Sequence, residues 1–324
     1  MKSLLLAALS SLLLTPAFAD NTGGRLHEIE HFFENANVIS GPEIVDCTLS
    51  RGTETKCFSI TVKAEPKSYE PGPWCPSSIN DSAENGGIWL KDGKAHDVDG
   101  TFITNLAELY DDDTWQLFDE ATGEVRVTNT QASCEAAARP DVDPEYNNYC
   151  VQCLPEYMPE DASMTYVIPL EPQHTWRTSP TGFTGSGVAN NGIRLDGPAP
   201  VDAILSAHTI APFDDCGGHV NTHVGYHYHA ATDCLTDAGS ATKHAAHIGI
   251  AMDGYDIYSH ILTDGSTPDD LDKCGGHEND GLDYHYHAGD VGSNAILSCL
   301  HAETGCASED PDKTCDATAK PQRP

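Results

Sequence analysis

Basic residues are scarce in this sequence. The 324 residues include 50 Asp and Glu against 17 Lys and Arg, which gives a formal net charge of −33. A surface this acidic repels phosphate, so the composition argues against nucleic-acid binding and against docking onto anionic membranes. Apolar residues still make up 39% of the chain, too many for a disordered acidic protein. Together with 28 Gly and 20 Pro, they predict a folded protein rich in loops.

Long hydrophobic runs are absent after residue 19, so we expect no membrane span in the rest of the chain. Residues 1–19 combine Lys2, an apolar run and the small-residue ending Ala17-Phe18-Ala19, which is typical of a secretory signal peptide. The apolar run is shorter than the roughly 20 residues that a membrane anchor requires. We therefore expect cleavage before Asp20 and a secreted or periplasmic protein.

The cysteine count is even, at 12. In an exported protein such a count predicts six disulfides. Cys150 and Cys153 have the spacing of a redox motif or of half a zinc site, but the sequence has no second CxxC pair. We therefore favour structural disulfides from these residues to Cys75 and Cys134. Spacing also suggests bridges between Cys47 and Cys57, Cys216 and Cys234, and Cys274 and Cys299.

Helical patterns are few. Apolar residues recur at helical spacing over residues 26–38, and a second helix is expected over residues 104–110. Elsewhere, short strand-like runs such as residues 58–62, 88–90 and 166–170 are broken by Gly, Pro, Asn and Asp. The sequence therefore predicts a mainly β fold with long, disulfide-stapled loops.

The second half of the chain contains two copies of one pattern. Cys-Gly-Gly-His occurs at residues 216–219 and 274–277, and Tyr-His-Tyr-His occurs at residues 226–229 and 284–287. These copies are 58 positions apart, and residues 191–197 match residues 248–254 at an offset of 57. We interpret the pattern as an internal duplication, which predicts two pseudo-symmetric halves sharing one core.

These blocks, together with Ala-Met-Asp-Gly-Tyr-Asp-Ile-Tyr at residues 251–258, resemble the YHYH-domain family of secreted proteins. The resemblance covers about residues 166–300. Residues 271–277, Leu-Asp-Lys-Cys-Gly-Gly-His, depart modestly from the family's usual Leu-Asp-Glu-Cys-Asn-Gly-His block. The resemblance implies a domain but no particular reaction. We divide the chain into a signal peptide (1–19), an N-terminal β-rich region (20–165), a duplicated YHYH domain (166–305) and a C-terminal tail (306–324).

Tyr-His-Tyr-His suits a metal site. In an extended strand alternate side chains share a face, so the two imidazoles of each copy lie together and the two phenols pack on the reverse face. The His of each Cys-Gly-Gly-His, reaching in from a loop, would complete a set of three ligands. The predicted metal ligands are His219, His227 and His229 in the first copy, and His277, His285 and His287 in the second.

Two other interpretations of these residues stay open. The histidines could be hydrogen-bonded members of a polar core, or the neighbouring cysteines could be thiolate ligands of a Cys/His zinc site. An all-imidazole site suits copper or zinc. Calcium is a further candidate at the acidic residues Asp264, Asp269, Asp270 and Asp272, although their spacing is not that of an EF-hand.

Residues between the copies are the candidates for catalysis. His244, His247 and Asp253 could orient metal ligands or act as a base beside the metal, or they could be ordinary turn and surface residues. His27-Glu28-Ile29-Glu30-His31 matches the HExxH zinc-protease motif, but no scaffold precedes it and no third ligand is recognisable. An amphipathic N-terminal helix is the simpler interpretation.

Two classes of function follow. The preferred one is a secreted metal-binding protein of the YHYH-domain family. The alternatives are a metal-dependent hydrolase or oxidase acting on an extracellular substrate, or an extracellular interaction protein with a structural metal. Three ligands with a bound water would favour an enzyme, and four protein ligands would favour a structural metal. The sequence alone decides neither whether the protein is an enzyme nor what its substrate would be.

Overall fold

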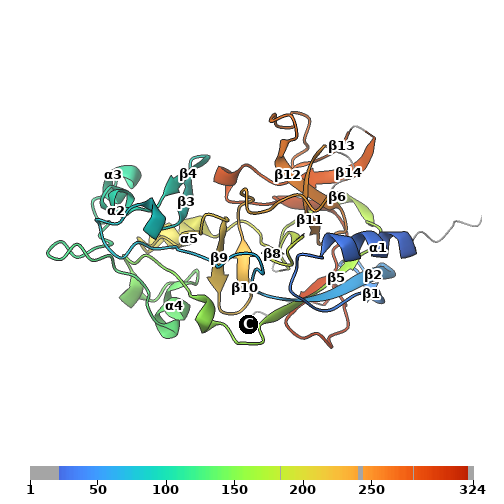
Figure 1. The fold of residues 1–324 in the computed structure, drawn as a ribbon, viewed down its shortest axis with the longest axis horizontal. Helices are drawn as coiled ribbons and strands as arrows, with labels where there is room; N and C mark the ends of the chain where they lie inside the picture. Colours follow the sequence, from blue (N-terminus) through green and yellow to red (C-terminus); the bar gives the residue numbers. More distant parts are fainter. Residues whose placement is uncertain (1–21, 183, 240–243, 280, 320–324) are drawn as a thin grey trace, which may run out of the picture.

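Strands dominate the structure, a computed structural model that describes residues 22–182, 184–239, 244–279 and 281–319 (Figure 1). Strands account for 34% of the residues and helices for 15%, so the mainly β prediction is confirmed. The predicted signal peptide lies outside the described residues. Within them, no helix is long and apolar enough to cross a bilayer.

A four-stranded sheet carries the N-terminal helix. Its strand order is β1-β2-β5-β16, and α1 packs against it through Ile29, Phe32 and Phe33, all of which are buried. The predicted helix over residues 26–38 was wrong at its end, because the Asn-rich turn after Phe33 stops it and Val38 begins the first strand. The bounds are α1 (Thr22–Phe32), β1 (Val38–Thr48), β2 (Glu54–Lys63), β5 (Ser163–Pro169) and β16 (Cys306–Ser308).

An eight-stranded sheet forms the centre of the molecule. Its order is β13-β14-β12-β11-β7-β8-β10-β9, and the pairing scheme is the same when followed outward from the centre in either direction. In each half an antiparallel hairpin is followed by a parallel neighbour and a second hairpin. The strands are β7 (Gly187–Ala189), β8 (Arg194–Leu195), β9 (Gly218–Asn221), β10 (Gly225–Tyr228), β11 (Ala245–Ala251), β12 (Asp256–Leu262), β13 (Gly276–Asn279) and β14 (Leu282–His287).

The strand registers align the two halves differently from the sequence comparison. Gly187 faces Leu195 in one central hairpin, and the residues 62 positions later, Gly249 and Ile257, face each other in the other. The offset of 57 assigned to this block was therefore wrong, because it matched Asp196-Gly197 to a turn that corresponds to Asn191-Gly192. Gly192 and Gly254 both have positive φ, 84° and 92°, as these two tight turns require. The two halves therefore share one topology, and their origin by internal duplication stays a prediction.

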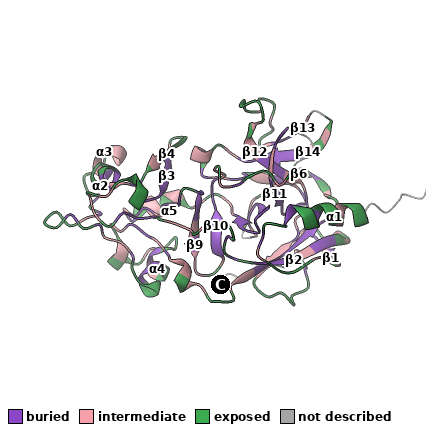
Figure 2. Cartoon of the chain, viewed as in Figure 1, coloured by how far each residue is buried: buried purple, intermediate pink, exposed green. Residues whose placement is uncertain are grey.

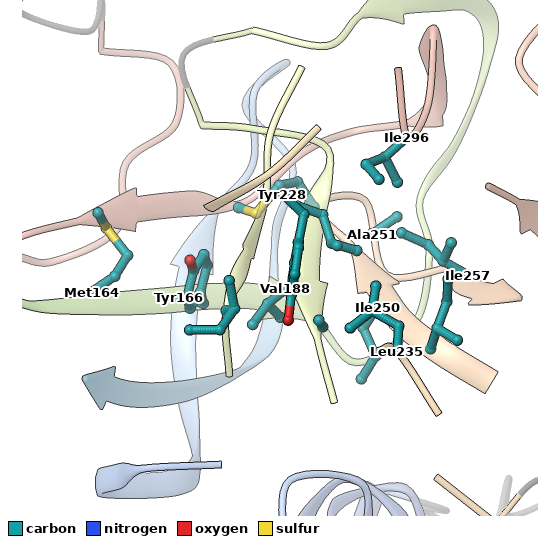
Figure 3. Close-up of a cluster of buried hydrophobic side chains, with 14 of the residues drawn as sticks. Met164, Tyr166, Val188, Tyr228, Leu235, Ile250, Ala251, Ile257 and Ile296 are labelled. Carbon is teal, nitrogen blue, oxygen red and sulfur yellow. The ribbon is translucent and has the colours of Figure 1, made fainter. Parts of the chain in front are cut away.

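Most of the buried apolar side chains belong to two hydrophobic clusters. The larger joins α1, the four-stranded sheet and the central sheet, with Tyr166, Val188, Tyr228 and Ile250 among its buried members (Figure 3). The smaller lies around Trp89 at the other end of the molecule, where α2, α3, β3 and β4 gather (Figure 1). The remaining elements are β3 (Ile88–Lys91), β4 (Lys94–Asp97), α2 (Gly100–Thr104), α3 (Leu106–Tyr110), α4 (Gln131–Ala137), β6 (His174–Pro180), α5 (Val201–Ser206) and β15 (Cys299–Ala302).

All twelve cysteines are paired, which confirms the prediction of six disulfides. The suggested pairings hold, and the sixth bridge joins Cys306 to Cys315. The thiolate interpretation of a zinc site fails, because a cysteine in a disulfide offers no thiolate. The other bridges are Cys47–Cys57, Cys75–Cys150, Cys134–Cys153, Cys216–Cys234 and Cys274–Cys299.

The division of the chain into domains at residues 165 and 305 stays a prediction.

Candidate metal centres

The two Tyr-His-Tyr-His segments run along β10 and β14, with His229 one residue beyond the end of β10. In the first, His227 and His229 have ring centroids 4.9 Å apart on one face of the strand. Tyr226 and Tyr228 point the other way into the core and are almost fully buried. The alternation is that of an extended strand, and it separates the imidazoles from the phenols. Figure 2 shows β10 coloured as buried.

The third imidazole of each set comes from the neighbouring strand of a hairpin. His219 on β9 faces His227 on β10, and His277 on β13 faces His285 on β14. The expectation that these two histidines reach in from a loop was therefore wrong. A separation of eight residues around a tight turn puts two positions opposite each other, and this separation, present in both copies, is the signal that could have revealed the pairing.

We call the first group the three-histidine site. Its possible ligand nitrogens all lie within 4.8 Å of one another. Two of its rings are buried and the third is half-buried. The members are His219, His227 and His229.

We call the second group the four-histidine site, because His244 joins the three repeat histidines there. Its Nε2 atom lies 3.0 Å from Nε2 of His287, and the four ligand atoms also lie within 4.8 Å of one another. All four rings are buried. His244 was considered as an orienting group or a base, and the structure makes it a fourth potential ligand. The members are His244, His277, His285 and His287.

Backbone carbonyls fix the orientation of four of the rings. Nδ1 of His227 lies 3.0 Å from the carbonyl oxygen of Gly225, and Nδ1 of His285 lies 2.9 Å from that of Asp283. The second His of each strand has a matching contact, at 2.8 Å to Gly197 and 2.7 Å to Ser259. A carbonyl oxygen can only accept, so Nδ1 carries the hydrogen and the Nε2 lone pair faces the centre of the cluster. Metal-ligating histidines are oriented in this way.

Burial keeps these rings neutral. Desolvation lowers the pKa of His229 to about 3 and that of His287 to about 4. The pKa values of His219, His227 and His285 are also lowered, again chiefly by burial. Neutral imidazoles with free Nε2 lone pairs are the form that binds a transition metal.

The surroundings of the two sites differ. The three-histidine site opens onto a cavity of about 990 Å³, and none of the four-histidine rings lines it. Asp196 also lies at the three-histidine site, with Oδ2 4.0 Å from Nε2 of His227. Burial opposes the charge of Asp196, but Arg194 and the nearby imidazoles lower its pKa to about 2. This carboxylate near the cluster was missed, because only the parallel pairing of β8 with β10 brings it there.

The phenols form a separate network behind the imidazoles. Tyr69 lies 2.5 Å from the phenol oxygen of Tyr228, and Tyr226 donates to Asp214 at 2.9 Å. Desolvation raises the pKa of Tyr69 to about 12, so its phenol stays protonated. These tyrosines therefore pack and hydrogen-bond on the reverse face.

The other two candidates for catalysis lie outside both clusters. Nε2 of His247 lies 3.5 Å from Asp256, and its ring stacks on Tyr258. Asp253 is fully buried and accepts a 2.8 Å hydrogen bond from Tyr286, on the phenol side of the strand. The structure therefore brings His244 into a cluster, but neither His247 nor Asp253.

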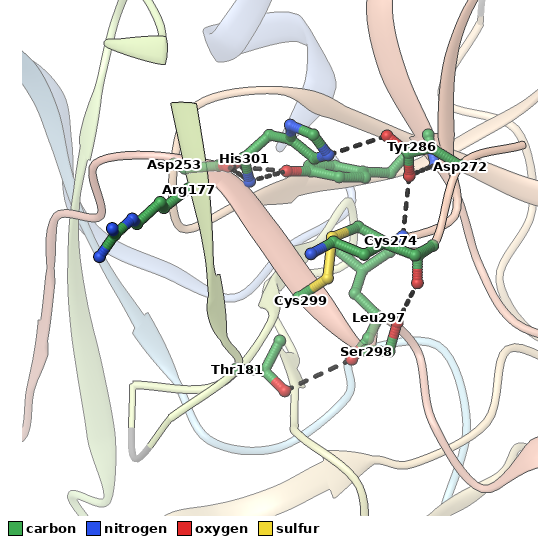
Figure 4. Close-up of a disulfide and its surroundings, with 12 residues drawn as sticks. Arg177, Thr181, Asp253, Asp272, Cys274, Tyr286, Leu297, Ser298, Cys299 and His301 are labelled. Atoms are coloured by element: carbon green, nitrogen blue, oxygen red, sulfur yellow. Dashed lines mark hydrogen bonds and ion pairs between the residues drawn. A yellow bond between two sulfur atoms is a disulfide. The ribbon is translucent and has the colours of Figure 1, made fainter. Parts of the chain in front are cut away.

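Other potential metal sites have different explanations. His27 and His31 on α1 are exposed, and each lies near a glutamate of the same helix segment, so the HExxH match is surface of an amphipathic helix. Asp272, Cys274 and His301 also lie close together, but Cys274 is bonded to Cys299 (Figure 4). Among the acidic residues considered for calcium, Asp270 contacts Nδ1 of His277 at 2.6 Å.

Comparison with known proteins identifies one region. The family model described as YHYH protein matches residues 165–270, a range that contains the three-histidine site and His244. No curated protein matches the chain. No solved structure matches it either.

Proposed function

From the match of residues 165–270 to the YHYH protein family and from the histidine geometry, we propose that the chain is a secreted metal-binding protein of this family. It holds one transition-metal ion at the three-histidine site and another at the four-histidine site. The repeat histidines are the ligands, and His244 adds a fourth at the second site.

One observation carries the proposal, the convergence of Nε2 atoms whose rings are already fixed through Nδ1. In the four-histidine site, Nε2 of His277 lies 3.0 Å from Nε2 of His285. Both Nδ1 atoms face oxygen acceptors, so neutral rings would point two lone pairs at each other. A polar core would avoid that arrangement, whereas a metal ion uses both lone pairs.

The donor set selects the class of metal. Imidazole nitrogens suit copper and zinc, and affinity alone places Cu²⁺ above Zn²⁺. All twelve cysteines are in disulfides, so no thiolate ligand is available to build a blue-copper or Cys/His zinc site. The acidic shell, with its net charge of −33, raises the local concentration of cations.

The disulfides and the N-terminal sequence both support export of the protein. Six disulfides form and persist in oxidising compartments, and residues 1–19 have the pattern of a signal peptide. We therefore place the mature protein outside the cytoplasm, in the periplasm or outside the cell.

Metal content and affinity test the proposal. The purified protein, stripped and reloaded with Cu²⁺ or Zn²⁺, should hold two ions per chain by elemental analysis. His227→Ala with His229→Ala should remove one ion, and His285→Ala with His287→Ala should remove the other. His223→Ala is the matched control, because His223 is an exposed histidine in the β9–β10 turn. Unchanged stoichiometry and affinity in both double variants would refute the proposal.

A second candidate function is a metal-dependent enzyme. The cavity at the three-histidine site favours it, because catalytic metal sites have three protein ligands and an open position. The four-histidine site has the complement of a closed, structural site. Turnover of a screened substrate by metal-loaded protein, lost in His227→Ala with His229→Ala but kept in His285→Ala with His287→Ala, would establish this candidate. Dependence of that turnover on O₂ would separate an oxidase from a hydrolase.

A further inference from the structure

The two histidine sites differ at one position, the fourth ligand. The central hairpins correspond at an offset of 62 residues, as the pairs Gly187–Leu195 and Gly249–Ile257 show. In the second half, β11 continues from this hairpin back to Ala245, next to His244, whereas β7 begins only at Gly187. Among the described residues of the first half, no further imidazole joins His219, His227 and His229 in the way that His244 joins the second set.

The cavity lies beside the three-histidine site, and all three imidazoles line it. Gly182 and Thr184 line it as well. Gly182 is exposed, and a Cβ atom added there would meet no other atom within 4 Å. A side chain at residue 182 would therefore have room at this edge of the cavity.

One polar group beside the open position is held in place. Oδ1 of Asp196 accepts hydrogen bonds from Arg194 at 3.0 Å and from the N–H of Gly197 at 2.8 Å. Oδ2 is the atom that lies 4.0 Å from Nε2 of His227. At the offset of 62 the counterpart of Asp196 is Tyr258, so this carboxylate also belongs to the first site alone.

The rest of the cavity is mainly aliphatic. The buried pair Arg194 and Asp196 is internally neutralised, and the charged residues at its rim, among them Arg139 and Lys313, are exposed. Such a lining favours a neutral molecule with an apolar body, and the net charge of the chain opposes anions. The aliphatic lining residues include Val151, Met164, Val167, Ile204, Val220 and Val224.

We propose that the three-histidine site holds its metal with an exchangeable coordination position facing the cavity, and that a neutral, largely apolar molecule with one lone-pair donor binds there. The four-histidine site, in contrast, keeps its metal closed to outside ligands. This inference rests on the proposed metal binding. It goes further by assigning the two sites different tasks and by naming the class of ligand.

Cobalt-loaded protein and two probes test the inference. Co²⁺ reports a change of coordination in its visible spectrum, and the probes are imidazole and 4-phenylimidazole at pH 8, where both are neutral. In His285→Ala with His287→Ala, which retains only the first site, we expect 4-phenylimidazole to change the spectrum and to bind at least tenfold more tightly than imidazole. In His227→Ala with His229→Ala, which retains only the second, we expect no change with either probe.

Gly182→Trp is the decisive variant, because Gly182 lines the cavity and has room for a side chain. It should narrow the cavity, keep two bound cobalt ions per chain and weaken 4-phenylimidazole binding at least tenfold. His223→Ala should bind the probe like the unaltered protein. Cobalt counted in each sample separates the two proposals, because absence of bound metal overturns both. Two bound ions with equal response of both sites, or with no response at the first, overturn the inference alone.

Discussion

The Nε2 atoms of His277 and His285 lie 3.0 Å apart across the β13–β14 hairpin, although Nδ1 of each ring already faces an oxygen. The oxygens are Oδ1 of Asp270, at 2.6 Å, and the carbonyl of Asp283, at 2.9 Å. Both nitrogens at the centre would therefore be acceptors if the rings were neutral. A metal ion between the two rings would accept both lone pairs, whereas the metal-free pair leaves them facing each other.

Loss of one of these two lone pairs should weaken the four-histidine site. We expect His277→Ala to bind Zn²⁺ at that site at least tenfold more weakly, because one of four converging imidazoles is removed. Calorimetry with Zn²⁺ measures the affinity, and His223→Ala should bind like the unaltered protein because His223 is exposed. Unchanged affinity in His277→Ala would show that this imidazole is not a ligand.

Metal removal should destabilise the protein. A ligand that binds only the folded chain stabilises it by about 2.7 kcal/mol at a concentration one hundred times its Kd. We therefore expect chelation to lower the thermal midpoint by several degrees, and Zn²⁺ or Cu²⁺ to restore it. The double variant His285→Ala with His287→Ala should lose the part of this shift that comes from the second site. A midpoint that is unaffected by chelator in fully loaded protein would contradict the expectation.

Local patterns in the sequence predicted the parts of the site that local geometry determines. Alternation along one strand put His227 beside His229. The cysteine spacing around each histidine set anticipated the bridge from Cys216 to Cys234 and its counterpart in the second half. In these cases the partners are close in the chain or repeat with the same spacing, so few arrangements compete.

Long-range pairings could not be predicted in the same way. Asp196 reaches the three-histidine site only because β8 runs parallel to β10, and a parallel pair needs a crossover whose course no local pattern specifies. The central turns were misaligned for a related reason, because Asp196-Gly197 and Asn191-Gly192 are both good turn sequences. Only the strand register shows that Asn191-Gly192 matches Asp253-Gly254.

The stability of the metal-free protein should fall as the pH falls from about 6.5 toward 4. The pKa values of His229, about 3, and His287, about 4, lie below the ordinary 6.5, so these rings stay neutral in the folded chain and are protonated on unfolding. The contribution of these two rings to the free energy of unfolding is complete above pH 6.5. It is lost as the pH falls from 6.5 toward 4, at up to about 1.4 kcal/mol per pH unit for each ring.

Chemical denaturation of metal-free protein at pH 7, 6 and 5 tests this pH dependence. His229→Gln should reduce the slope of the unfolding free energy against pH, because one ring no longer titrates. His223→Ala should leave the slope unchanged, since His223 is exposed. A free energy of unfolding that stays constant from pH 7 to 5 would contradict the assignment of buried neutral rings.

Asn191 and Asp253 perform matching tasks in the two halves, and this relationship predicts how position 253 tolerates change. Asn191 donates to the phenol oxygen of Tyr228 at 2.8 Å, and Asp253 accepts from Tyr286 at 2.8 Å. Asp253 also accepts from the N–H groups of His301 and Ala302, at 3.1 and 3.0 Å (Figure 4). Burial raises the pKa of Asp253 against the lowering effect of these donors.

Asp253→Ala should therefore cost about 1–3 kcal/mol of stability, because three buried donors lose their acceptor. Asp253→Asn keeps an acceptor oxygen at the site, so we expect less than half that loss. Both variants should keep two metal ions per chain with unchanged affinity, since Asp253 contacts the phenol network and not the imidazoles. Denaturant unfolding and elemental analysis on the same samples measure the two effects. Loss of metal from folded Asp253→Asn would instead place this carboxylate in the metal-binding machinery.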